Sequence, residues 1–383
     1  MNNKKIVLLL ATLFIGLSTF GKSNSPLGSC FSLNKANFEK TIEGKQVGLY
    51  LLKNGELEMA ICNYGGRIVS LSVPAKNGDK TDIVLGFKSI DDYIKATGAF
   101  HGANIGRVAG RIVNGQFNLN GKSYFLPLNT PPNHLHGGAK GFHNQVWEVS
   151  STTDSSLVLT YLSVDGEMGY PGNLKVTATY ILNAKNEFSL EFTATTDKST
   201  PINLTNHAFF NLAGEGSGPI LNQILSIPAA NICPLNNLGI PNGELLKVKS
   251  TPFDFISPKI IGSDLSLEPL NEQLKFAGGY DHHFVLKSKK TNEMKLAATL
   301  VEPKSGRKME VFTDEPCIHF FSANFFKGTD IGKMGKPYNF RESFALETQR
   351  FPMVPNSKLF ESIILNPGET YEGKTIYRFS VIK

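Results

Sequence analysis

Val176–Tyr180 reads V-T-A-T-Y and Phe188–Ala194 reads F-S-L-E-F-T-A, so apolar and polar residues alternate along both segments. Side chains of a strand point alternately to opposite faces, and this alternation predicts strands with one buried and one exposed face, as in antiparallel sheets. Leu296–Val301 and Lys308–Thr313 also favour strands, with less regular alternation. Asn120-Gly121 lies between two apolar segments and is a strong hairpin signal.

Helical patterns are scarce, and only Ile90–Thr97 indicates a short helix. The chain has no low-complexity linker and no repeat of fixed period. These features predict an all-β protein, with one large antiparallel β-sandwich over residues 38–383. Two smaller sandwiches are the alternative. Lys327–Tyr338 is rich in Gly and Lys and is predicted to be a long exposed loop, of the kind that often rims a binding site.

The N-terminus has the pattern of a targeting segment. Lys4 and Lys5 precede an apolar run, Ile6–Phe20, which is too short to span a bilayer. A charged start and a short apolar core are typical of a secretory signal peptide, predicted here for residues 1–25. We therefore expect an exported protein, periplasmic or lipid-anchored at the envelope of a bacterium, with no membrane span.

Cys30 is a possible site of lipidation. It follows Leu27-Gly28-Ser29, which resembles the lipobox of bacterial lipoproteins, but a polar stretch, Lys22–Pro26, separates it from the apolar core. Cleavage near Thr19–Gly21, without lipidation, is the alternative.

Composition limits the possible partners. The 383 residues carry a net charge of +6, and no run of five or more Lys or Arg indicates a nucleic-acid surface. Cys62, Cys233 and Cys317 are widely spaced, show no metal-binding motif and no obvious pairing, and at least one is expected to be a buried thiol.

His207 is the most informative histidine. It lies in Asn203–Gly214, N-L-T-N-H-A-F-F-N-L-A-G, where amide side chains flank it and Phe209 and Phe210 follow. Amides and aromatic faces suit a sugar, which offers hydroxyls at its edge and C–H bonds on its face. At strand spacing, one of the two phenylalanines is expected to point into the core.

Other polar groups leave several interpretations open. His134 and His136 would point to the same side of an extended segment and could share a metal ion, although no metal motif supports this. Arg107 and Arg111 are either structural or a donor fork for an oxygen-rich ligand.

Six segments together resemble the aldose 1-epimerase family, in the family's order and over nearly all of the chain after the signal region. They are Gly106–Ile112 (G-R-V-A-G-R-I), Leu135–Gly138 (L-H-G-G), Gly166–Val176 (G-E-M-G-Y-P-G-N-L-K-V), Asn203–Gly214, Tyr280–Phe284 (Y-D-H-H-F) and Leu346–Gln349 (L-E-T-Q). The resemblance implies a galactose mutarotase-like supersandwich. It also implies interconversion of the α and β anomers of free aldohexoses, such as glucose and galactose, without a cofactor.

The resemblance also implies roles for individual residues. His207 corresponds to the general acid and Glu347 to the general base of the family. Further matching positions bind the sugar: Arg111, His136 and Asp281. Two positions depart from the usual pattern, because Gly110 stands where the family often has Asn and His319 stands where many members have Gln. These departures concern the preferred sugar more than the reaction.

Opening the sugar ring requires one base and one acid, and a carboxylate with an imidazolium meets that need. We also expect Asp281, as an anion, to help keep His207 protonated. The partner is then a small-molecule aldose, and the chain is expected to act as a monomer or homodimer.

Three other functions remain open. A non-catalytic carbohydrate-binding protein of an exported sugar-uptake system is the main alternative. An epimerase of phosphorylated sugars would need an additional basic pocket, which the sequence does not indicate. A glycoside hydrolase would need two paired carboxylates, which only Asp281 and Glu347 could provide.

Overall fold

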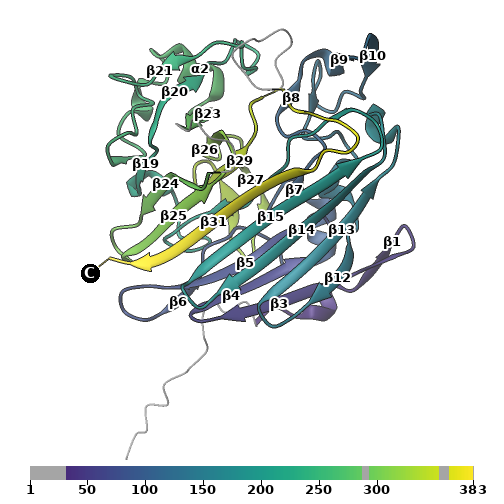
Figure 1. Cartoon of the computed structure of the whole chain (residues 1–383). Coiled ribbons are helices and arrows are strands. Elements are labelled where there is room, and N and C mark those ends of the chain that lie inside the picture. The colour runs from purple at the N-terminus through teal and green to yellow at the C-terminus, as the bar shows by residue number, and fades with distance from the viewer. Residues whose placement is uncertain (1–31, 287–292, 353–361, 383) are drawn as a thin grey trace, which may run out of the picture.

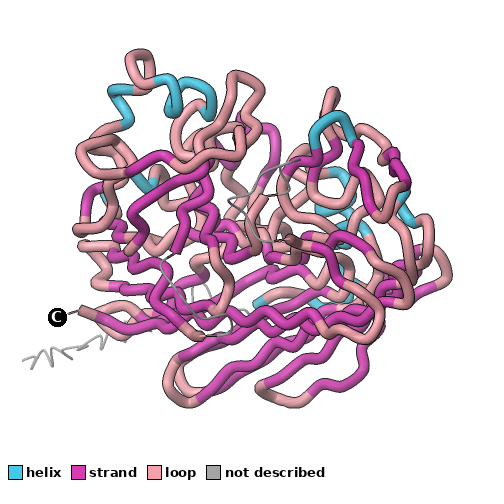
Figure 2. Tube along the Cα trace, turned by 45° about the horizontal axis from the view of Figure 1, so that its top comes forward, coloured by secondary structure: helices cyan, strands magenta, loops and turns pink. Residues whose placement is uncertain are grey.

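The computed structural model describes residues 32–286, 293–352 and 362–382. The predicted signal peptide and Cys30 lie outside these ranges. Within them the protein is built of antiparallel sheets, and Figure 2 shows helix only in short pieces among strands and loops. No helix among the described residues is both long and apolar enough to cross a membrane.

The largest sheet found in the described ranges has nine strands. In spatial order they are β12 (Glu148–Thr152), β13 (Ser156–Ser163), β14 (Leu174–Asn183), β15 (Glu187–Thr196), β31 (Tyr371–Val381), β25 (Arg307–Thr313), β24 (Lys295–Val301), β19 (Ile224–Ser226) and β22 (Lys259–Ile260). The long ribbons β13, β14, β15 and β31 run side by side in Figure 1. The predicted alternation is confirmed, because Val176, Ala178 and Tyr180 are buried and the residues between them are partly exposed.

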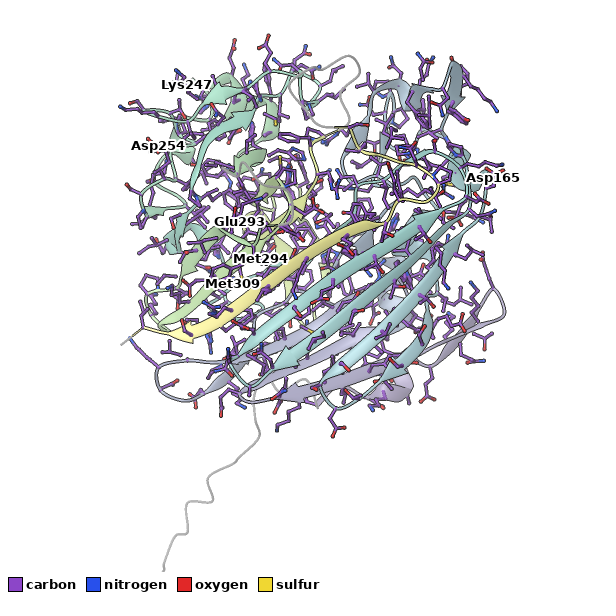
Figure 3. All side chains as sticks on the ribbon, viewed as in Figure 1. Asp165, Lys247, Asp254, Glu293, Met294 and Met309 are labelled. Carbon is purple, nitrogen blue, oxygen red and sulfur yellow. The ribbon has the colours of Figure 1, made fainter. Side chains whose placement is uncertain are left out.

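Two further sheets of the described chain share a core with this one. The six-stranded sheet has the order β18 (Phe209–Phe210), β29 (Phe344–Gln349), β26 (Cys317–Phe321), β23 (Asp281–Leu286), β20 (Ala229–Cys233) and β21 (Leu246–Lys247). The four-stranded sheet consists of β3 (Leu49–Asn54), β4 (Leu57–Cys62), β5 (Arg67–Pro74) and β6 (Lys80–Asp82). One apolar cluster takes side chains from all three sheets, including Met309 of β25, which is labelled in Figure 3. The predicted all-β sandwich class is confirmed.

The shorter elements border these sheets. The strand pairs are β1 (Lys40–Ile42) with β2 (Lys45–Val47), β7 (Asn104–Ile105) with β17 (Thr205–Asn206), β8 (Arg111–Ile112) with β11 (His134–Leu135), β9 (Gln116–Leu119) with β10 (Lys122–Phe125), β16 (Thr200–Pro201) with β30 (Ile364–Leu365), and β27 (Lys327–Ile331) with β28 (Pro337–Asn339). The α-helices are α1 (Ile90–Lys95), close to the predicted helix, and α2 (Glu272–Ala277), which the sequence did not predict.

The hairpin predicted at Asn120-Gly121 is confirmed. Leu119 of β9 pairs with Lys122 of β10, so Asn120 and Gly121 form the two-residue turn. Their φ angles are 51° and 75°, and the tight turns that match the twist of a hairpin require positive φ at both central residues.

The prediction for Lys327–Tyr338 is correct in part: most of these residues are exposed and several line the large pocket, but the segment is a hairpin and not a loop. The segment contains β27 and the start of β28, which pair antiparallel, and the side chains of Lys333 and Tyr338 are buried. Lys333 donates to the backbone oxygens of Val69 and Val84, so the hairpin is fixed onto the four-stranded sheet. Polar composition alone did not reveal this burial.

Candidate active site

The floor of a large pocket is one face of the six-stranded sheet. Its opposite face carries Ile318, Phe320 and Leu346 into the core. Because side chains alternate along a strand, the residues between these face the pocket. His283 of β23 pairs in register with His319 of β26, and His319 pairs with Glu347 of β29. These three side chains therefore form a row across three adjacent strands, and all of them line the pocket.

His207 stands over the end of this row. It lies between β17 and β18, and its backbone N–H donates to the carbonyl of Ala103 at 2.8 Å. Its imidazole stacks against Phe100 with 5.8 Å between ring centroids, and Phe209 lies on another side at 4.7 Å. Nε2 is 3.5 Å from Oε1 of Glu347, with both side chains buried. Two segments 140 residues apart in sequence thus bring an imidazole and a carboxylate into contact.

The two phenylalanines after His207 divide as expected. Phe209 lines the pocket, whereas Phe210 packs in the central apolar cluster. Successive side chains of a strand point to opposite faces, and the two residues of β18 follow this rule.

The two arginines of the G-R-V-A-G-R-I segment also have different surroundings. Arg107 is buried and donates to Ser163 Oγ at 2.9 Å and to the carbonyl oxygens of Ser163, Val164 and Pro171. Burial lowers its pKa to about 10. Arg111 lines the pocket, and its side chain has no hydrogen bond or ion pair with any described residue. Of the two interpretations left open for the pair, each fits one residue: Arg107 is structural, and Arg111 alone offers its donors to the pocket.

His134 and His136 do not share one side, contrary to the prediction from an extended segment. The φ angle of His136 is 52°, so the chain turns there. His134 Nδ1 lies 2.7 Å from the carbonyl oxygen of Pro127, away from the pocket that His136 lines. Gly110 also lines the pocket, and its N–H donates to His136 Nδ1 at 3.2 Å.

Burial, together with the nearby charges of His207 and Arg111, holds the pKa of His136 well below its usual value. A neutral His136 whose Nδ1 accepts the Gly110 N–H carries its proton on Nε2. It is thus prepared to donate one hydrogen bond to a ligand.

Asp281 and His319 form a second pair, which is partly buried. Nε2 of His319 is 2.7 Å from Oδ1 of Asp281. Burial would raise the pKa of Asp281, but the hydrogen bond and charge of His319 outweigh it and hold the value at about 2. The expected partnership of Asp281 with His207 is not the observed one, because the carboxylate in contact with His207 is that of Glu347.

The pocket has a volume of about 590 Å³ and a polar floor with an aromatic rim. Phe100, Phe321, Phe325 and Phe326 contribute the aromatic surface, and β27 contributes Lys327, Thr329 and Asp330. All seven predicted site residues line it: Gly110, Arg111, His136, His207, Asp281, His319 and Glu347.

Sequence reasoning missed His283 and Phe100. For β27 it predicted a place at a binding site but not the strand, because Lys327–Tyr338 was expected to be a loop of the kind that often rims a site. A signal for His283 was present, since it follows Asp281 by two positions in a strand and must share its face.

An all-β fold with a buried imidazole and carboxylate in contact, in a pocket lined by hydrogen-bonding groups and aromatic rings, suits a protein that acts on carbohydrates. The sequence model of the aldose 1-epimerase family matches residues 48–378. Galactose mutarotase of Rattus norvegicus is 38% identical over 338 residues, which cover 88% of this chain and 95% of that protein. Aldose 1-epimerase of Escherichia coli (strain K12) is 35% identical over 333 residues, which cover 86% and 94%.

Solved structures of similar proteins agree with this family assignment. An aldose epimerase homologue from C. elegans superposes with a TM-score of 0.78 at 30% identity, covering 88% of this chain and all of that one. Galactose 1-epimerase from Lactobacillus acidophilus NCFM gives a TM-score of 0.76 at 28% identity, covering 90% and 97%. The chain belongs to the aldose 1-epimerase family and is an enzyme that interconverts the α and β anomers of aldoses.

Proposed function

We propose that the substrates are free aldohexoses such as glucose and galactose, with Glu347 as general base and His207 as general acid. The observation that carries this assignment is the 3.5 Å contact between His207 Nε2 and Glu347 Oε1 on the pocket floor. The oxygen of the anomeric hydroxyl and the ring oxygen are bonded to the same carbon, C1. An acid and a base that lie this close can each reach one of them.

In the ring-opening step, Glu347 takes the proton of the anomeric hydroxyl while protonated His207 gives its proton to the ring oxygen. The C1–O5 bond breaks, and an aldehyde remains at C1. Rotation about C1–C2 presents the other face of the aldehyde. The two residues then act in reverse: His207 recovers the proton from the C5 hydroxyl, and Glu347 returns its proton to the new anomeric oxygen. Each positioned proton transfer contributes about 10²–10⁴-fold.

The remaining pocket groups would hold the sugar. The uncommitted donors of Arg111 suit sugar oxygens, and His136 can donate one further hydrogen bond. Asp281 and His319 together offer an acceptor and a charge-assisted pair beside Glu347. Gly110 has a φ of +81°, which L side chains rarely adopt, and no atom lies within 4 Å of the position that a Cβ would take, so the pocket is open at this point. A sugar with an extra substituent at that point has room.

Polarimetry on a panel of fresh aldoses tests the proposal. The purified protein should speed the change in optical rotation of α-D-glucose, α-D-galactose or both. A folded protein that shifts its melting temperature with sugar but leaves every mutarotation rate unchanged would be a binding protein instead. The presence of both Glu347 and His207 argues against that outcome, because pure binding needs no acid–base pair.

We also propose that the enzyme works outside the cytoplasm. The support is the sequence of the N-terminus, with Lys4 and Lys5 before the apolar run Ile6–Phe20. Fractionation of the producing cells and mass spectrometry of the mature N-terminus test this. Cleavage within residues 19–30 supports export, and an acylated Cys30 would add a lipid anchor. An intact Met1 in the cytoplasm would overturn it.

A further inference from the structure

Three polar side chains on adjacent strands form an unbroken chain beside Glu347. Asp281 Oδ1 contacts His319 Nε2 at 2.7 Å, and His319 Nδ1 contacts His283 Nδ1 at 3.2 Å. His319 is also the register partner of Glu347 across β26 and β29. Cβ atoms of directly opposed residues lie about 4.5–5.5 Å apart, so whatever charge His319 carries acts at short range on Glu347.

Proton counting limits the states of this chain. An ionised Asp281 only accepts, so the proton of the first contact belongs to His319 Nε2. The second contact joins two nitrogens and holds one proton. Either His319 is an imidazolium that donates from Nδ1 to an unprotonated His283 Nδ1, or His319 is neutral and His283 donates to it. A state with both rings charged would lose the hydrogen bond and place two cations in contact.

The surroundings favour the first state. Burial would lower the pKa of His319, but the hydrogen bond and charge of Asp281, assisted by Glu347, raise it above its ordinary value. Burial and the neighbouring His319 hold the pKa of His283 well below its ordinary value.

The other charged or titratable groups around the pocket come from several elements. They are Arg111 on β8, His136 after β11, His207 before β18, Lys327 and Asp330 on β27, and Tyr338 on β28, while His282 of β23 packs against Phe253 on the opposite face of the sheet. Arg111 opposes the charge on His319, but at longer range than Asp281, whose hydrogen bond is direct.

We propose that His283 is a positioning residue, which accepts the Nδ1 proton of His319 and so holds that ring as an imidazolium directly across from Glu347 on the neighbouring strand. This inference rests on the proposed role of Glu347 as the base. His283 does not itself exchange a proton with the sugar. It fixes the orientation and protonation of His319, whose positive charge then lies beside the side chain of Glu347.

The pH–rate profile for mutarotation is the main test. His283→Leu removes the acceptor, so the cation on His319 becomes less stable and Glu347 loses its neighbour's charge. We expect kcat to fall about tenfold on the acid side of the profile, which is the loss that a limb displaced by one pH unit produces, and to change little at neutral pH. The acid limb of kcat, the fall in rate toward low pH, should move up by about one pH unit, because the proposed base loses the opposite charge beside it. His283→Asn keeps an acceptor at this position and should restore the acid limb of kcat to its wild-type position.

A second measurement does not depend on activity. Proton and nitrogen NMR of ¹⁵N-histidine-labelled protein should show His319 titrating above its ordinary range in the wild type, and at lower pH in His283→Leu. Val285→Leu, two residues further along β23 and on the same face, is the matched control and should change neither readout.

The outcomes separate the inference from the proposed function. A wild-type enzyme that accelerates mutarotation, with His283→Leu leaving both the acid limb and the His319 titration unchanged, overturns the inference alone. So does a loss in His283→Leu that His283→Asn fails to restore, since that pattern indicates a merely structural role. A wild-type protein without activity on any aldose overturns the proposed function, while the NMR titration still decides whether His283 controls the charge of His319.

Discussion

At the scale of single residues, Arg107 and Arg111 show how one motif divides into structure and function. They are four positions apart, yet Arg107 has its donors bound by Ser163 and nearby carbonyls, whereas Arg111 offers its own to the pocket. An arginine fork cannot be replaced by a lysine without losing donors.

Lysine substitutions should therefore separate the two roles. We expect Arg111→Lys to lower kcat/KM for mutarotation about tenfold with an almost unchanged melting temperature. We expect Arg107→Lys to lower the free energy of unfolding by about 1–3 kcal/mol, because it leaves buried acceptors unsatisfied. Polarimetry and thermal melts of both variants measure this contrast. Equal effects of the two variants on stability would contradict the division.

The site residues were predictable to different degrees. His207 and Glu347 were identified from the family's motifs, but their contact depends on the register of β29, which no local pattern encodes. The different fates of His134 and His136 depend on one positive φ angle at a non-glycine residue, which the sequence does not reveal. His283 could have been found from strand alternation alone.

At the scale of elements, the β27–β28 hairpin forms one wall of the pocket and is held by a buried lysine. Lys333 Nζ lies 3.3 Å from Asp82 and 3.4 Å from Glu215. It also donates to two backbone carbonyls of the four-stranded sheet and its continuation. Burial would lower the pKa of Lys333, but the charges of Asp82 and Glu215 outweigh it and raise the value. The sequence could not predict this anchor, because a buried and a solvated lysine look alike in a polar segment.

Lys333→Met should destabilise the protein strongly. Removing one partner of a buried ionic cluster leaves the others without compensation and costs about 3–5 kcal/mol. Lys336→Met in the same hairpin is the matched control, because Lys336 is exposed and only caps the carbonyl of Gly216. Urea denaturation of both variants measures the difference. A Lys333→Met protein as stable as Lys336→Met would show that the hairpin does not depend on this anchor.

At the scale of the whole molecule, buried neutral histidines make stability depend on pH. Burial lowers the pKa of His101 to about 4, and of His143 and His282 to about 3. In the unfolded chain each would titrate near 6.5. The unfolded state therefore binds more protons below that value, and stability is lost as pH falls from about 6.5 toward the folded pKa values.

We expect the free energy of unfolding to fall between pH 7 and pH 4, by up to about 1.4 kcal/mol per pH unit for each such histidine. Denaturation at a series of pH values measures this slope. His101→Phe should make the slope shallower, because it removes one of the titrating imidazoles. A phenylalanine suits the position, since the His101 ring packs among aromatic side chains and its Nε2 has no hydrogen-bond partner among the described residues. A stability that stays constant or rises on acidification would contradict the prediction.

The class of the fold was predictable from the sequence, but the order in which the strands pair was not. Alternation in Val176–Tyr180 and Phe188–Ala194 indicated strands with one buried face, and β14 and β15 have that pattern. The order of the nine-stranded sheet places β31 between β15 and β25, so residues close to the C-terminus join strands from distant parts of the chain. Such long-range pairing depends on the core that the sheets share. The sequence of a single segment does not contain the information that decides it.

Glu347 is proposed as the base that opens the sugar ring, and Glu347→Gln tests this role most directly. The substitution keeps the size of a side chain that is only 2% exposed, and removes its capacity to accept a proton. Glu372→Gln, at an exposed position of β31, is the control. On fresh α-D-galactose or α-D-glucose, we expect wild type and Glu372→Gln to accelerate mutarotation equally, and Glu347→Gln to be slower by about 10² or more at an unchanged melting temperature. A Glu347→Gln protein with the wild-type rate would show that Glu347 is not the base.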